Sequence, residues 1–199
     1  MPIIELRGTD FTRTFSGTGT YFSELETSVY VVDTVLSGST SGIGSLRINW
    51  NGEVLIRWIA GNPPINFGSN IRMGICIRYL TVNLPNGTQM RAGIFIGGLQ
   101  AGIGVENNGG IYRYFIFPYL FSISYITPNY FEQIIMRQES ALFLSHYSFS
   151  NSNTKTLTTS FTLPFTSFSG QAGFFLHTVP SSYGIILFDY FFIEEYVGA

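Results

Sequence analysis

The chain has 199 residues, of which 45% are hydrophobic, 17% are aromatic and only 11% are charged. Charged residues usually make up about 25% of a soluble protein, so this surface must be built mainly from small polar residues and tyrosine. The apolar content argues against a disordered chain. The net charge of −2 provides no basic surface for nucleic acid or anionic lipid, so neither is an expected partner.

Two further features of the sequence limit its setting. Cys76 is the only cysteine, so no disulfide can form within the chain, and we expect a buried thiol. The first residues lack the basic segment and apolar run of a signal peptide. The most apolar stretch, Tyr114–Ile126, is interrupted by Pro118 and is shorter than the roughly 18 residues that span a bilayer, so we expect no membrane insertion.

Short apolar runs rich in Ile, Phe, Tyr and Thr follow one another along the chain, and none has the 3.6-residue period of a helix. Turn residues separate them, which favours a β-sandwich or barrel. The expected strands are Ile3–Arg7, Ser28–Leu36, Ser45–Trp50, Glu53–Ala60, Ile71–Val82, Met90–Ile96, one or two within Ile111–Ile126, Phe131–Gln138, Ala141–Phe149, Lys155–Leu163, Ala172–Thr178 and Gly184–Tyr196.

Three local signals predict where these strands end. Asn51-Gly52 between two apolar runs predicts a hairpin that pairs Ile48 with Leu55. Asn62-Pro63-Pro64 is expected to break the chain, because proline cannot donate to a sheet. Gly102-Ile103-Gly104 belongs to a glycine-dense stretch that we interpret as tight turns, since no helix or Lys-Ser/Thr pair follows it as in a phosphate loop.

The last strand, Gly184–Tyr196, contains one acid, Asp189, and is otherwise apolar at positions on both of its faces. In a regular strand Ile186, Phe188, Tyr190 and Phe192 face one way, and Asp189 faces the other. We therefore predict a central strand that is covered on both sides. The whole chain is predicted to be one all-β domain, residues 1–199, in which 1–27 contribute a strand and a loosely ordered arm.

The order of elements from Ile71 onward resembles the concanavalin A-like jelly-roll sandwiches, including laminin G-like domains. The resemblance rests on the long alternating strand Ile71–Val82, the glycine-rich pair Met90–Glu106, the strands Phe131–Arg137 and Ala141–Phe149, and the final Phe188–Phe191 run. It implies a two-sheet antiparallel jelly roll. It also implies that the terminal strands lie close together, with Ile3–Arg7 pairing near Ile185–Ile193.

Some jelly rolls of this kind are glycoside hydrolases, which need two carboxylates on one strand face. Their Glu-x-Asp-x-x-Glu motif is absent here, and the nearest pair, Glu24 and Glu26, lacks a third acid. The two histidines, His146 and His177, lie on separate expected strands, so we expect neither a metal site nor a catalytic triad. The sequence therefore predicts a protein without catalytic residues and without a required cofactor.

Aromatic residues are the candidate ligand-binding residues. Trp50, Trp58, Tyr112 and Tyr114 could stack on sugars, as the resemblance implies, or could belong to the core. Asp189 is the candidate metal ligand, because the resemblance places a structural calcium near an acid on the last strand. Calcium needs six to eight oxygen ligands, and the alternative for Asp189 is a hydrogen bond to backbone or to an arginine such as Arg7.

Charge depletion with aromatic enrichment is typical of interface cores. The sequence therefore predicts a non-catalytic structural subunit of a virion (capsid, turret, spike or fibre) or of another extracellular assembly. Its expected partners are copies of itself or other particle proteins, and its expected location is the virion surface or the extracellular space. Two alternatives are open, a lectin-like module that binds glycans and a glycoside hydrolase with an unrecognised acid pair.

Overall fold

The structure, a computed structural model, describes residues 3–8, 26–27, 30–35, 45–67, 71–118, 121–123, 131–138, 142–149, 155–163 and 168–195. Every regular element within these ranges is a strand. The described residues therefore contain no helix that is long and apolar enough to cross a membrane. The strands are β1 (Ile3–Gly8), β2 (Glu26–Thr27), β3 (Tyr30–Val35), β4 (Ser45–Asn51), β5 (Leu55–Phe67), β6 (Ile71–Asn83), β7 (Thr88–Ile96), β8 (Leu99–Asn108), β9 (Ile111–Phe117), β10 (Phe121–Ile123), β11 (Phe131–Gln138), β12 (Leu142–Phe149), β13 (Lys155–Leu163), β14 (Phe168–His177) and β15 (Tyr183–Glu195).

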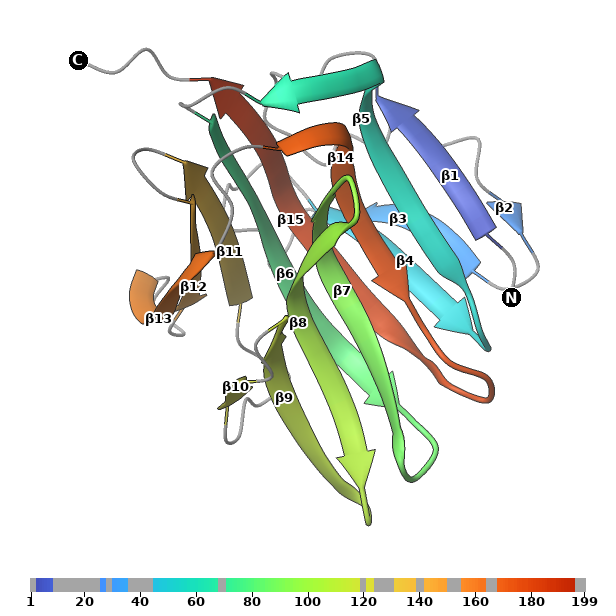
Figure 1. Ribbon diagram of the computed structural model, residues 1–199. Coiled ribbons are helices and arrows are strands. Elements are labelled where there is room, and N and C mark those ends of the chain that lie inside the picture. Colours follow the sequence, from blue (N-terminus) through green and yellow to red (C-terminus); the bar gives the residue numbers. More distant parts are fainter. Residues whose placement is uncertain are drawn as a thin grey trace.

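The strands form two sheets that pack face to face (Figure 1). Sheet A has the order β1-β5-β14-β7-β8-β9-β10, and sheet B has the order β13-β12-β11-β6-β15-β4-β3-β2. The described pairings are antiparallel, except that β1 runs parallel to β5. This arrangement confirms the predicted all-β jelly-roll sandwich of the concanavalin A-like type.

The main core lies between the two sheets and is built from alternate residues of each strand. On β6, Met73, Ile75, Ile77 and Tyr79 all point inward, as the alternating pattern predicted. Tyr79 crosses the core and donates a hydrogen bond from its hydroxyl to the carbonyl oxygen of Ile103 on sheet A, at 2.7 Å. The buried polar end of a large side chain thus joins the two layers.

The Asn51-Gly52 turn corrects the first of the predicted signals. β4 lies in sheet B and β5 in sheet A, so the turn carries the chain from one layer to the other, and Ile48 does not pair with Leu55. The amide of Gly52 donates to the carbonyl of Ser182, at 2.6 Å, rather than across a hairpin. Gly52 does adopt the expected positive φ, 92°. A positive φ suits a hairpin turn and also a turn that crosses between the sheets, so it does not distinguish them.

Asn62-Pro63-Pro64 does not break β5, which continues to Phe67. The pairing of β14 with β5 shifts register here, passing from Ala172 opposite Ala60 to Gly170 opposite Ile65. Proline lacks an amide donor, so it is tolerated where a ladder is interrupted. The two prolines fall in that interruption, and Figure 1 shows β5 bending sharply near its end.

β15 is a central strand, between β6 and β4, as predicted. Side chains were predicted to alternate between the two faces along the whole strand. This alternation is interrupted, because a register shift lies between Phe188 and Tyr190, at Asp189. After the shift, Phe191 pairs with Ile75, a residue of the core. A β-bulge inserts one residue and so reverses the alternation beyond it.

The first strand corrects an expectation drawn from the resemblance. β1 pairs with β5 at the edge of sheet A, whereas Ile185–Ile193 belong to β15 at the centre of sheet B. The predicted strands Phe131–Gln138 and Ala141–Phe149 correspond to β11 and β12, which form a hairpin with Gln138 opposite Leu142. The loosely ordered arm predicted within residues 1–27 falls almost entirely outside the described residues.

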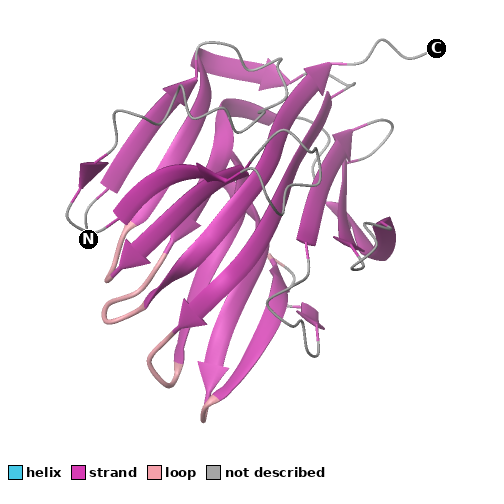
Figure 2. Cartoon of the chain, turned by 180° about the vertical axis from the view of Figure 1, so that it is seen from behind, coloured by secondary structure: helices cyan, strands magenta, loops and turns pink. Residues whose placement is uncertain are grey.

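Four of the described turns lie together at one end of the sandwich (Figure 2). Hydrogen bonds between turns hold this end together. The hydroxyl of buried Thr178 accepts a hydrogen bond from the amide of Val54 and can donate to the carbonyl of Gly52, both at 2.8 Å. On the other side, the side-chain oxygen of Asn86 accepts a hydrogen bond from the amide of Gly109.

Candidate functional site on the outer face of sheet A

The face of sheet A that points away from sheet B carries a second hydrophobic cluster, which is made of aromatic residues. Its four rings are almost completely buried, although they do not belong to the main core. We call them the phenylalanine layer, which consists of Phe95, Phe115, Phe117 and Phe175. The rings pack edge to face or tilted, with Phe117 at 6.1 Å from Phe175 and 6.3 Å from Phe115 between centroids.

Glycines make room for this layer. Gly93 on β7 pairs with Gly102 on β8, and a Cβ on either one would lie 2.6 Å from the Cα of the other. A Cβ on Gly102 would also lie 2.8 Å from the ring of Phe117, and one on Gly104 would collide with the ring of Phe115. The sequence interpretation of Gly102 and Gly104 as turn residues is therefore wrong, because both lie within β8, beneath aromatic rings.

Two arginines lie over the layer. The guanidinium carbon of Arg57 is 4.4 Å from the centroid of Phe95, and that of Arg91 is 5.4 Å from the centroid of Phe117. Both distances allow a cation–π interaction. The two arginines occupy outer positions because their neighbours Ile56 and Ala92 point into the core.

His177 stands beside this arrangement at the end of β14, and it is half-buried. Its strand partners are Arg91 on β7 and Leu55 on β5. Burial lowers the pKa of the His177 imidazole below 6.5, the positive charge of Arg91 lowers it further, and the negative charge of Glu53 opposes both. His177 is therefore neutral at neutral pH and is able to accept a proton.

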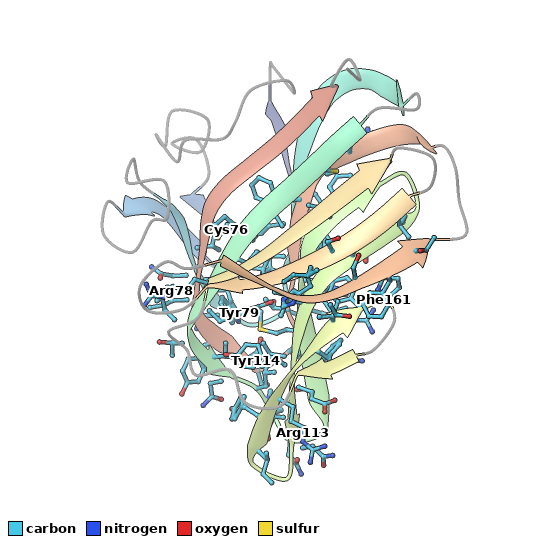
Figure 3. The ribbon with its side chains drawn as sticks, turned by 90° about the vertical axis from the view of Figure 1, so that its left-hand side faces the viewer. Cys76, Arg78, Tyr79, Arg113, Tyr114 and Phe161 are labelled. Carbon is cyan, nitrogen blue, oxygen red and sulfur yellow. The ribbon has the colours of Figure 1, made fainter. Side chains whose placement is uncertain are left out.

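A further charged pair borders the site toward the turns. Glu106 on β8 lies opposite Arg113 on β9, and Gln89 on β7 lies on the other side of Glu106. Arg113 is exposed, and Figure 3 shows it near the end of the sandwich where β8 turns into β9. The outer face thus combines a buried aromatic floor with polar side chains that include three arginines and two glutamates.

Three of the residues predicted to bind ligand lie on the core side. Trp50 is 3% exposed and donates from its indole nitrogen to the hydroxyl of Ser182, at 3.3 Å. Tyr114 is 6% exposed, and Figure 3 shows it beside Tyr79, with the ring centroids 5.7 Å apart. Tyr112 packs against the core, and its hydroxyl accepts a hydrogen bond from the amide of Leu84. The rings of Trp50 and Tyr114 are too buried to offer a face to a sugar, whereas Tyr112 is partly exposed, and its role in ligand binding stays a prediction.

The two remaining predicted residues have backbones that the structure describes and side chains that it does not. Trp58 pairs with Phe174 on β14, and Asp189 lies at the bulge of β15. In the part of the chain with described side chains, no three His, Cys, Asp or Glu residues are grouped as metal ligands. The role of Asp189 as a calcium ligand therefore stays a prediction, and no chemistry is derived from it.

The other candidate reactive groups are distant from the site. His146 lies on β12 of sheet B and is 1% exposed, whereas His177 lies on sheet A, so the two histidines are not brought together. Cys76 is fully buried in β6, as predicted.

The sequence analysis missed the importance of His177, Arg57 and Arg91. Each is the one charged or titratable residue of its strand and follows a core residue, in the segments LIRW, MRAG and FLHT. That pattern is visible in the sequence. The order β5-β14-β7, which makes the three strands neighbours, is not.

No family model matches the chain, and no curated protein matches its sequence. Solved structures do match its fold. A GH131 β-glucanase catalytic domain from Podospora anserina has a TM-score of 0.56 at 12% identity, over 96% of this chain and 98% of that one. An endo-β-1,4-glucuronan lyase from Trichoderma reesei has a TM-score of 0.52 at 10% identity, over 92% and 95%.

A third similar structure is an engineered GH43 glycoside hydrolase with endo-xylanase and exo-arabinofuranosidase activity. It has a TM-score of 0.50 at 15% identity, and the match covers 95% of this chain but only 42% of that one. Similarity at these levels of identity establishes the fold alone. It supports the predicted concanavalin A-like sandwich.

The comparisons nevertheless correct two predictions. The sequence predicted a non-catalytic subunit of a virion or extracellular assembly, and it predicted no enzymatic activity. The structures that match over most of this chain include two glycoside hydrolases and a polysaccharide lyase, so the fold is one that carries carbohydrate-active enzymes. The absence of one local acid motif does not exclude catalysis, because catalytic residues can come from strands distant in sequence.

Proposed function

We propose that the protein is a polysaccharide-cleaving enzyme whose active site lies on the outer face of sheet A. The observation that carries the proposal is the pairing of His177 with Arg91 above the phenylalanine layer. The similarity of the whole chain to a β-glucanase domain and a glucuronan lyase supports the substrate class. A broad sheet face also suits a polymer, because it can contact several sugar units at once.

His177 is the proton-transfer group in this proposal. A histidine whose pKa lies below 6.5 is neutral at neutral pH, so it can act as a general base without first losing a proton. Glu53 limits how far the pKa of His177 falls and stabilises the imidazolium that forms when the proton arrives. Arg57 and Arg91 cover the aromatic floor and place positive charge beside the reacting group.

The test is cleavage of a panel of polysaccharides, followed as the release of new reducing ends. The panel contains a β-glucan, an arabinoxylan and a polyglucuronate. We expect the full-length protein to cleave at least one of them, and His177→Gln to lower the rate by about 10²- to 10⁴-fold, the usual contribution of a general base.

The matched control is Leu157→Ala, since Leu157 is 52% exposed on β13, at the far edge of sheet B. This variant should cleave at the rate of the unmodified protein. Thermal unfolding of both variants checks that they fold. Full activity of a folded His177→Gln protein, or no cleavage of any polymer by the unmodified protein, would contradict the proposal.

A further inference from the structure

The outer face of sheet A carries a small excess of positive charge. Arg57, Arg91 and Arg113 come from β5, β7 and β9, against two acids with described side chains, Glu53 and Glu106. Three arginines against two glutamates give this face a formal charge of +1, although the whole chain carries −2. β1 leaves this net charge unchanged, because it contains one acid, Glu5, and one arginine, Arg7.

The arginine beside His177 is a suitable partner for a carboxylate. The guanidinium carbon of Arg91 lies 5.4 Å from the centroid of Phe117, a distance that allows a cation–π interaction. A guanidinium group can bind a carboxylate through two N–H donors along its edge. Arg91 therefore places a positive charge and carboxylate-binding donors next to His177, its partner across the strands.

The acids of this face do not suit hydrolysis. Glycoside hydrolases use two carboxyl groups that are about 5 to 9.5 Å apart. Glu53 directly precedes β5 and Glu106 lies in β8, and the strands β14 and β7 separate them. Three inter-strand spacings amount to about 14 Å. Among the described side chains of this face, a base next to a cation is present and an acid pair is not.

We infer that the site binds an anionic polysaccharide made of uronate units and cleaves it by β-elimination. Arg91 binds the carboxylate on C5 of the sugar, and His177 removes the proton from C5. The C4–O4 bond breaks as a C4=C5 double bond forms, and O4 of the departing chain takes a proton from water. His177 then returns its proton to solvent. Arg57 and Arg113 bind carboxylates of other units along the chain.

This inference rests on the proposed function, and one experiment separates the two. Polyglucuronate and a neutral β-1,4-glucan are each incubated with the full-length protein in water enriched in ¹⁸O. Reducing ends are counted, and the ultraviolet absorbance of the conjugated C4=C5 double bond is measured. We expect polyglucuronate to give one double bond for each new reducing end, without ¹⁸O in the products of cleavage, and the neutral glucan to stay intact.

Each other result has one meaning. Cleavage of the neutral glucan with ¹⁸O uptake, and no double bonds from polyglucuronate, overturns the inference and leaves the proposed function standing. Cleavage of polyglucuronate with ¹⁸O uptake and no absorbance also overturns elimination. If no polymer is cleaved, the proposed function itself fails.

Arg91 provides the second test, because its role could be confined to covering Phe117. If Arg91 binds the carboxylate, Arg91→Gln raises KM for polyglucuronate at least about tenfold, which is the loss of one charge-assisted contact. Arg91→Lys recovers part of that loss. With the methyl ester of the same polymer, which lacks the negative charge, the two variants and the unmodified protein should show similar KM values.

A purely structural Arg91 predicts a different pattern. The thermal midpoint of Arg91→Gln would then fall, and its KM values for the acid and for the methyl ester would change together. Equal changes for the two polymers overturn the assignment of Arg91, whatever the stability of the variant.

Discussion

The two faces of sheet A exclude water by different means. The inner face is mainly aliphatic and is closed by the opposite sheet, with Tyr79 reaching across to Ile103. The outer face is aromatic, stands on glycines, and has Arg57 and Arg91 lying over its rings. Burial is nearly complete on both, so burial alone does not distinguish a core from a site. The difference is that two of the outer rings, Phe95 and Phe117, contact arginine side chains, which can also bind a ligand.

Adjacent phenylalanines on β14 give the largest test of this comparison. Phe174 points inward and lies 4.8 Å from Phe188 between ring centroids, whereas Phe175 belongs to the outer layer, and each is 1% exposed. We expect Phe174→Ala to lower the free energy of unfolding by about 3–5 kcal/mol, the usual cost of such a cavity. Phe175→Ala should cost about 2 kcal/mol, because the flexible stems of the arginines can settle into the space.

Urea denaturation of the two variants measures both values. Equal losses would mean that the outer layer is packed as rigidly as the core. A larger loss for Phe175→Ala would reverse the comparison.

The glycines under the outer layer give an intermediate effect. A Cβ on Gly102 would meet the backbone of Gly93 and the ring of Phe117, so Gly102→Ala should lower the free energy of unfolding by about 1–3 kcal/mol through overpacking. Gly98, in the neighbouring β7–β8 turn, has open space around it. Gly98→Ala is therefore the matched control and should change stability by less than about 0.5 kcal/mol. Similar stabilities for the two variants in thermal unfolding would show that the strands are not held together as closely as described.

The smallest effect is a pH dependence of stability that comes from His177 on the outer face. The pKa of His177 is lowered by folding, so as pH falls the unfolded chain takes up the proton first. The contribution of His177 to stability is complete above pH 6.5 and declines as pH falls from 6.5 toward the lowered value. Unfolding midpoints measured from pH 7.5 to 5 should show this decline, and His177→Gln should reduce it.

Its two charged neighbours should move the decline in opposite directions. Glu53→Gln removes the charge that raises the pKa of His177, so the decline should extend to lower pH. Arg91→Gln removes a charge that lowers the pKa, so the decline should become shallower. Direct titration of the His177 ring by NMR measures the pKa in each variant. Shifts in the same direction for both would refute the described placement of these charges.

Local patterns in the sequence were enough to predict most strands but not their sheets. Alternation along Ile71–Val82 predicted the core face of β6, and Lys155–Leu163 was predicted with the bounds that β13 has. The Asn51-Gly52 signal failed because a two-residue turn with positive φ suits a hairpin and also a crossing between layers. Hydrogen bonds to Ser182, far along the chain, decide between them.

The candidate site was less predictable for the same reason. Trp50 and Tyr114 were chosen because aromatic rings are common in sugar-binding sites, but composition does not reveal which rings face the core. His177 and Arg91 are 86 positions apart in the sequence, and they become neighbours only because β14 inserts beside β7. No local spacing contains that information.

The last two strands fill the centres of both sheets. β14 lies between β5 and β7 in sheet A, and β15 lies between β6 and β4 in sheet B. During synthesis, therefore, neither sheet can be completed until residues 168–195 have left the ribosome, and until then β5, β7, β6 and β4 each lack a neighbouring strand. A chain shortened before β14 would expose these open sheet edges, which favour aggregation.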